Sequence, residues 1–139
     1  MRRQLFLYIN GKAHWIERKD AFLPLSDYLR YQLQLTGTKV VCAEGDCGAC
    51  TILLGRLDGD ELRYQAVNSC IQFMYQLDCT HIITIEGLNE NGKLNPVQEA
   101  MVQCHGAQCG YCTPGIVVAL CGKFISIRRT AHRLFECRL

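Results

Sequence analysis

The chain has 139 residues, which is enough for one domain of ordinary size or two small ones. Charged residues make up 20% of it, its net charge is +2 and no basic stripe is present, so we expect no nucleic-acid partner. No apolar run approaches the roughly 20 residues that a membrane-spanning helix needs, and the N-terminus lacks a signal-peptide pattern. We therefore expect a cytoplasmic protein without a membrane partner.

A hairpin and then a helix are predicted at the start of the chain. Alternating apolar runs flank Asn10-Gly11, and this dipeptide favours a hairpin because both residues tolerate the positive φ angles of a type I′ turn. The following LPLSDYLRYQLQLTG has apolar residues at helical spacing, with Ser26 as its expected N-cap and Gly37 as its expected end.

Three short strands are predicted after this helix. TILLG follows a cysteine-rich loop, LRYQAVNSC ends at Cys70, and HIITIEG is rich in β-branched residues. Taken with the hairpin and the helix, these strands predict a compact α+β domain over residues 1–85.

The chain changes character after the polar, turn-rich segment ENGKLNP (90–96), which marks a domain boundary. The next segment predicts an amphipathic helix whose apolar face carries Val97, Ala100, Met101 and Cys104. TPGIVVALCGKF opens with Thr113 as the expected N-cap, and its apolar run Ile116–Leu120 is typical of a buried helix. TAHRLFECRL predicts a third, weaker helix, so residues 86–139 are expected to form a helical domain.

The ten cysteines are the main chemical signal, because cytoplasmic cysteines bind metal or catalyse more often than they form disulfides. Cys42-x4-Cys47-x2-Cys50, followed by Cys70 after nineteen further residues, is the plant-type spacing of [2Fe–2S] ligands. A zinc site is the main alternative, although zinc ligands usually come as two close pairs. A disulfide knot conflicts with the compartment, and no histidine is tied to this loop as a nucleophilic cysteine would need.

The residues between these cysteines also fit a cluster. Gly45 and Gly48 let the backbone curl tightly, so that amide N–H groups can point at the anionic sulfur atoms. Glu44 and Asp46 lie beside an anionic site, and thiolate is the better ligand for these irons. We therefore expect both carboxylates to point outward.

Three segments, GTKVVCAEGDCGACTILLG, VNSCIQ and GAQCGYCTPGIVVAL, resemble the iron–sulfur region of the xanthine dehydrogenase family of molybdenum hydroxylases. The form of the first segment looks most like the small subunit of bacterial xanthine dehydrogenases. The resemblance implies a β-grasp ferredoxin domain (1–85) followed by a helical-bundle domain (86–139). It also implies electron transfer from a molybdopterin centre toward FAD through [2Fe–2S] clusters, with FAD and molybdopterin on partner domains or subunits.

The resemblance further implies that Cys109 and Cys112 ligate a second [2Fe–2S] cluster and that Gln108 lies beside molybdopterin. Read alone, this C-x-x-C is ambiguous between a zinc site, a redox dithiol and cluster ligands. The family's other two ligands belong to a C-R-C-T-G-Y motif that would fall near position 144, so we expect a truncated chain with an incomplete helical domain. Cys121 and Cys137 are the alternative ligands within the sequence.

Two functions remain open at this point. One is the iron–sulfur component of a xanthine dehydrogenase-like oxidoreductase that carries no complete substrate site on this chain. The other is a stand-alone, zinc-stabilised binding module without redox activity. The sequence contains no recognisable flavin, NAD or molybdopterin motif and no serine triad, so no residue is predicted to be catalytic.

Overall fold

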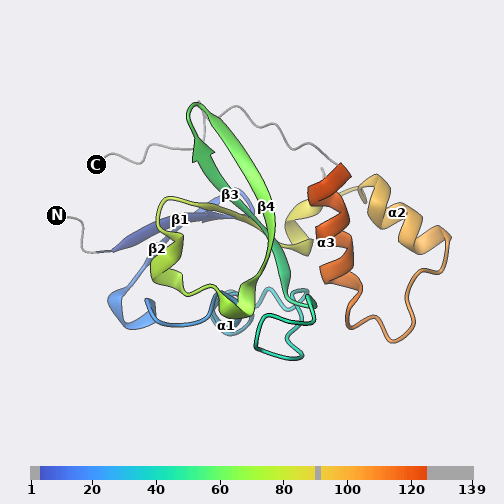
Figure 1. Ribbon diagram of the computed structural model, residues 1–139, viewed down its shortest axis with the longest axis horizontal. Coiled ribbons are helices and arrows are strands. Elements are labelled where there is room, and N and C mark those ends of the chain that lie inside the picture. Colours follow the sequence, from blue (N-terminus) through green and yellow to red (C-terminus); the bar gives the residue numbers. More distant parts are fainter. Residues whose placement is uncertain (1–3, 90–91, 125–139) are drawn as a thin grey trace.

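The computed structural model describes residues 4–89 and 92–124. Its centre is a five-stranded sheet with the strand order β2-β1-β5-β3-β4 (Figure 1). The strands are β1 (Leu5–Ile9), β2 (Lys12–Ile16), β3 (Thr51–Asp58), β4 (Glu61–Asn68) and β5 (His81–Ile83). β1 and β5 run parallel, and all other neighbouring strands are antiparallel.

The predicted N-terminal hairpin is confirmed. β1 and β2 pair up to Ile9 and Lys12, which leaves Asn10 and Gly11 as the two turn residues. Both have positive φ angles, 50° and 78°, as a type I′ turn requires. The side chain of Asn10 then accepts a hydrogen bond from the backbone N–H of Thr84, so this turn is tied to the far end of β5.

The first helix lies where it was expected but its ends were predicted wrongly. It consists of α1 (Leu25–Asp27), which continues directly as a π-helical turn (Tyr28–Gln32). Ser26 is a buried residue inside the helix, and Pro24 occupies the N-cap position without a side-chain hydrogen bond. The backbone N–H of Leu25 donates instead to Gln72 O at 2.7 Å, so a tertiary contact replaces the expected side-chain cap.

The helix also ends five residues before Gly37, at Gln32. The left-handed residue that follows it is Gln34, with φ of 57°. Gly37 serves a different contact, because its backbone N–H donates to the carboxylate of Glu86 at 2.8 Å. A Cβ on Gly37 would lie 2.5 Å from Ile85 Cγ2, so close packing against this later segment requires glycine there.

The three predicted strands are present, but their extents differ, and β3 continues past TILLG to Asp58. β4 ends at Asn68, and Cys70 lies in the 3₁₀ turn Ser69–Ile71 that follows it, not at a strand end. β5 is only three residues long and gives way to a second 3₁₀ turn, Ile85–Leu88.

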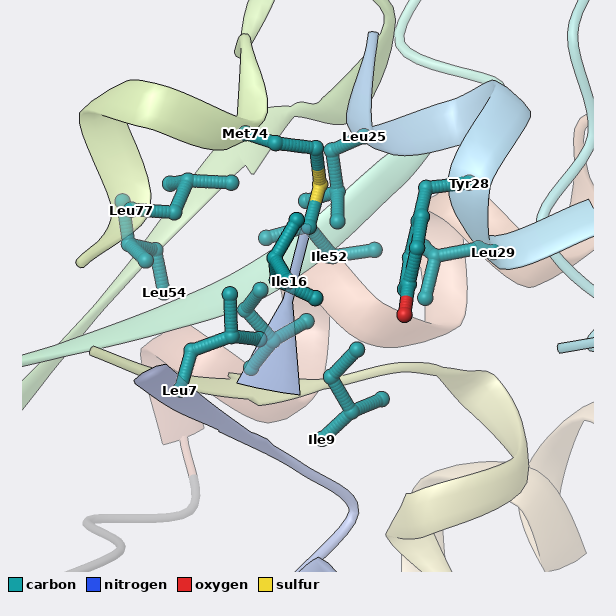
Figure 2. Packing of buried hydrophobic residues seen from close by; sticks show 11 residues of the cluster. Leu7, Ile9, Ile16, Leu25, Tyr28, Leu29, Ile52, Leu54, Met74 and Leu77 are labelled. Carbon is teal, nitrogen blue, oxygen red and sulfur yellow. The ribbon is translucent and has the colours of Figure 1, made fainter. Parts of the chain in front are cut away.

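The sheet buries both of its faces, and β3 shows this most clearly. Ile52 and Leu54 point into the larger core, which is closed by the first helix and by the 3₁₀ turn Met74–Leu77 (Figure 2). Leu53 points to the opposite face, into a second cluster. Successive strand residues alternate between faces, so this nearly continuous apolar strand needs cover on both sides.

Two helices follow the sheet, α2 (Pro96–Gln103) and α3 (Thr113–Phe124). α3 supplies the cover on the second face, where Val117, Val118 and Cys121 are buried against Leu53 and Ile83 (Figure 1). The start of α2 is fixed by Asn95, whose side chain accepts from the N–H groups of the second and third helical residues. α3 therefore completes the core of the sheet that precedes it.

Parts of the helical prediction were wrong in detail. Cys104 is exposed, although the apolar spacing placed it on the buried face of α2. Ile116 is 46% exposed, so the run Ile116–Leu120 is not buried on all sides. The third predicted helix and Cys137 lie outside the described residues. Within the described part of the chain, no helix has the length and apolar character needed to cross a membrane.

Candidate iron–sulfur sites

The first cysteine loop runs from Cys42 to Cys50 and enters β3 directly. Three of its residues have left-handed backbone angles, namely Ala43 (φ 60°), Gly45 (φ 84°) and Gly48 (φ 73°). The two glycines were predicted to curl the loop, and the structure confirms it. A Cβ on Gly45 would also lie 2.8 Å from Ile71 Cδ1, so two separate constraints select glycine there.

The curled backbone turns amide groups toward sulfur. The backbone N–H of Cys47 donates to Cys42 Sγ at 3.4 Å. This contact, together with the backbone N–H groups of Glu44 and Asp46 and the Cys47 thiol, lowers the pKa of Cys42 to about 6. Both carboxylates are on exposed residues, as expected. The loop therefore stabilises a thiolate with backbone dipoles before any metal is considered.

Cys50 and Cys70 are the buried half of the site, only 2% and 7% exposed. Cys50 directly precedes β3 and Cys70 follows β4, and these strands pair Thr51 with Asn68. Ser69 closes the junction, because its N–H and its hydroxyl both donate to Cys50 O, at 3.2 and 2.8 Å. Burial, followed by the hydrogen bond and charge of Cys50, raises the pKa of Cys70 to about 11.

The four predicted ligands therefore meet as two pairs. Cys42 contacts Cys47, Cys50 contacts Cys70, and Cys42 lies close enough to Cys70 for their charges to interact. A two-iron core is held by four thiolates, and hydrogen bonds from backbone amides to sulfur stabilise it. The paired thiols and inward amides fit such a [2Fe–2S] core.

Two residues that hold this site were missed in the sequence. The side-chain N–H of Asn68 donates to Gly45 O, and its Oδ1 lies 3.2 Å from Thr51 Oγ1. The hydroxyl of Thr51 donates to Gly48 O at 2.6 Å. Asn68 and Thr51 thus fix the carbonyls of both curled glycines. Their position next to the cysteine motifs, directly after Cys50 and two residues before Cys70, was the available signal.

The second motif has a different setting. Cys109, Cys112 and Gln108 are all exposed, in the loop between α2 and α3. α3 begins at Thr113, and Ile116 N–H donates to Cys112 O at 3.1 Å, so Cys112 occupies the N-cap position that was predicted for Thr113. A thiolate at this position faces the positive end of the helix dipole.

The alternative ligand Cys121 does not belong to this loop. It is fully buried on α3, and its thiol donates to Asn95 Oδ1 at 3.6 Å. Burial raises the pKa of Cys121, which disfavours the thiolate form that iron needs.

Comparison with known protein families matches two parts of the chain. Residues 7–75 match a 2Fe-2S iron-sulfur cluster binding domain, and residues 84–131 match a [2Fe-2S] binding domain. The chain thus falls in the class of proteins that join two [2Fe–2S]-binding domains, the first with a ferredoxin-like α+β fold.

Individual relatives narrow this class. The chain is 43% identical to a xanthine dehydrogenase of Blastobotrys adeninivorans over 119 residues, which are 84% of this chain and 8% of that protein. The solved aldehyde oxidoreductase of Desulfovibrio gigas matches with a TM-score of 0.75 and 40% identity, over 89% of this chain and 13% of the other. A chain of quinoline 2-oxidoreductase from Pseudomonas putida 86 matches with a TM-score of 0.69 and 37% identity, over 83% of this chain and 65% of the other.

The chain belongs to the iron–sulfur region of the xanthine dehydrogenase and aldehyde oxidoreductase family. This confirms the family resemblance and the predicted function, an electron-transfer [2Fe–2S] module of the molybdenum hydroxylase type. The chain spans about a tenth of the length of the curated relatives it matches.

Proposed function

We propose that this chain forms the electron-transfer part of a xanthine dehydrogenase-like oxidoreductase, between a molybdopterin centre and FAD. The observation that carries the proposal is the meeting of four thiols, three from the first cysteine loop and Cys70 from the turn after β4, where backbone amides of the loop face sulfur. Bound clusters would supply the one-electron chemistry, which no side chain of the chain can perform. FAD and molybdopterin would lie on other domains or subunits, and the whole assembly would work in the cytoplasm.

In this proposal Cys42, Cys47, Cys50 and Cys70 hold the first [2Fe–2S] cluster. The backbone N–H groups of the loop offset the negative charge of the four thiolates, and burial of two of the cysteines restricts water on one side. The exposed carboxylates of the loop stay in solvent, so they add little repulsion.

A second cluster would be held by Cys109 and Cys112 only where two further ligands are supplied. Both cysteines lie at the exposed start of α3, where another part of the enzyme can approach them. Gln108 is exposed in the same loop, which agrees with a position beside molybdopterin. No substrate site is proposed on this chain, so the substrate is left to the molybdopterin-binding partner.

The test is a metal and spectroscopic analysis of the anaerobically purified chain. We expect about two irons and two labile sulfides per chain if only the first site fills, and about four of each if both fill. The reduced protein should give the EPR signal of a [2Fe–2S] cluster. A colourless, EPR-silent protein that contains zinc and no sulfide would overturn the proposal in favour of a structural zinc module.

A further inference from the structure

Gly115 lies in the first turn of α3 and is buried against the backbone of the first cysteine loop. A Cβ at this position would stand 2.2 Å from Gly48 O and 3.0 Å from Ala49 O. These are backbone atoms, so the contact cannot be relieved by moving the end of a flexible side chain. Only glycine lets the helix come this close to the loop.

The loop side of this contact is held in place. Gly48 O accepts hydrogen bonds from Thr51 N at 3.1 Å and from Thr51 Oγ1 at 2.6 Å. Gly48 itself has a left-handed φ of 73°, and Ala49 is only 2% exposed. The loop therefore cannot turn away from an added methyl group without losing hydrogen bonds that fix it to the start of β3.

The helix side is held as well. Val117, Val118 and Cys121 of α3 are buried at 3% exposure or less against the second face of the sheet. Moving the first turn of α3 outward would pull these side chains from a close-packed cluster. Since neither side can yield freely, the separation of the helix start and the loop is set by the missing side chain at position 115.

This contact bears on the chemistry of the first site. The carbonyls of Gly48 and Ala49 belong to the same peptide units as the N–H groups of Ala49 and Cys50, so pushing a carbonyl turns the matching N–H. These peptide units lie between the cysteines Cys47 and Cys50. Hydrogen bonds from backbone N–H groups to cluster sulfur set the reduction potential, so the contact can tune the cluster.

The same contact bears on the second site. Cys112 lies three residues before Gly115, at the N-cap of α3, and Tyr111 packs under Lys39, which stands just before the first loop. The start of α3 therefore places the second motif beside the first loop. Electron transfer between two cofactors slows steeply with their separation, so a fixed approach matters for the proposed function.

We propose that Gly115 is a positioning residue for electron transfer. Because position 115 has no side chain, the start of α3 packs directly against the carbonyls of Gly48 and Ala49. This contact fixes the orientation of the peptide units around the first cluster and the distance between the second motif and the first loop. The inference rests on the proposed function.

The test compares Gly115→Ala with Gly122→Ala in the full chain, purified anaerobically. Gly122 is a matched control in the same helix, because its Cβ would meet the side chain of Leu53 at 2.6 Å and no backbone atom. Both variants should lower the melting temperature. Only Gly115→Ala should shift the visible circular dichroism, the EPR g values and the midpoint potential of the first cluster.

Unchanged signatures in Gly115→Ala at wild-type iron content would overturn the inference, and so would equal shifts in both variants. If Gly115→Ala is recovered without iron, Thr51→Val and Thr51→Ser test the same contact from the loop side. Thr51→Val removes the hydroxyl bond to Gly48 O and should shift the same signatures, whereas Thr51→Ser keeps the bond and should not. A wild-type signature in Thr51→Val then overturns the inference. A wild-type chain without iron and sulfide would instead overturn the proposed function, and the inference with it.

Discussion

The two cysteine motifs of this chain are built in different ways. The first site, formed by the loop of Cys42 to Cys50 and by Cys70, is closed by two paired strands, and two of its four cysteines are buried. The motif of Cys109 and Cys112 is exposed at a helix start, where the described backbone bonds are those of the helix itself and of the turn after α2. The first site is thus anchored to the sheet through the buried Cys50 and Cys70, and the second motif is exposed at a helix start.

This difference teaches how each site depends on the rest of the protein. Asn68 and Thr51 hold the first loop in its curled form through side-chain hydrogen bonds, so the chain alone defines most of that site. In the described part of the chain, the second motif is held by the start of α3, which packs against the sheet and the first loop. Metal binding and folding should therefore be coupled far more strongly at the first site.

The largest expected effect comes from removing a ligand of the first motif, compared with the same change in the second motif. Cys47→Ser should abolish the first cluster and lower the free energy of unfolding by several kcal/mol, because the bound cluster is part of the folding free energy of this domain. Cys109→Ser should leave the iron of the first cluster and the melting temperature unchanged. Iron analysis, visible spectra and thermal melting under anaerobic conditions measure both variants.

Cys104→Ser is the control for thiol loss, since Cys104 is exposed and outside both motifs. It should match the wild type in iron content and melting temperature. If Cys47→Ser kept its iron and its melting temperature, the assignment of the first site would be wrong. If Cys109→Ser lost both, the two motifs would not be independent.

A second large effect is expected in the chain without metal, as a difference in thiol reactivity within the first site. The pKa of Cys42 is lowered to about 6, chiefly by the backbone N–H of Cys47, so at pH 7 this thiol is mostly thiolate. The pKa of Cys70 is raised to about 11, chiefly by burial, so this thiol stays protonated. Since the thiolate is the nucleophile, iodoacetamide should label Cys42 first and Cys70 last.

Mass spectrometry of peptides after short labelling times measures this order. Labelling in denaturant is the control, because unfolding removes both shifts and should give the two cysteines similar rates. Equal rates in the folded chain would contradict the amide arrangement in the loop.

The sequence predicted the cysteines of the first site better than the residues that hold its loop in place. Local signals were enough for the hairpin at Asn10-Gly11 and for the left-handed glycines Gly45 and Gly48, because each depends on neighbouring residues. The left-handed Ala43 carries no such signal, since alanine rarely adopts this conformation. Asn68 acts across twenty-three positions on Gly45 O, and no local pattern encodes that reach.

The errors at helix ends have the same origin. Ser26 is a good N-cap by type, but the backbone bond from Leu25 to Gln72 O satisfies the helix start without it. Cys104 fits the apolar spacing of α2, but the helix ends at Gln103, so Cys104 is its C-cap and leaves the face from which Met101 packs against the second cluster. A long-range contact decided the first case and the position of the helix end decided the second.

A moderate effect is expected from Gly45→Ala. Alanine at φ 84° pays a backbone strain of about 1–2 kcal/mol, and its methyl group also meets Cδ1 of the half-exposed Ile71 at 2.8 Å, so this side chain must turn away. The matched control is Gly59→Ala, which has a left-handed φ of 62° but nothing within 4 Å of the added Cβ. Denaturant unfolding should show a larger loss for Gly45→Ala than for Gly59→Ala, and equal losses would mean that Ile71 does not press on the loop.

The smallest effect should come from the pair that joins the two motifs at the surface. Lys39 Nζ lies 5.8 Å from the ring centroid of Tyr111, and it also donates to Thr36 O at 2.8 Å. A cation–π contact at an exposed site contributes about 0.5–1 kcal/mol. A double-mutant cycle with Lys39→Met and Tyr111→Leu isolates this coupling from the bond to Thr36, because only the interaction energy survives the subtraction.

We expect the interaction energy between Lys39 and Tyr111 to stabilise the folded chain, as measured by denaturant unfolding under anaerobic conditions. High salt should weaken it only partly, because the ring quadrupole acts at short range, within the screening length. An interaction energy of zero would mean that Lys39 and Tyr111 do not connect the two motifs energetically. The buried contact of Gly115 with Gly48 and Ala49 would then be the contact that connects them.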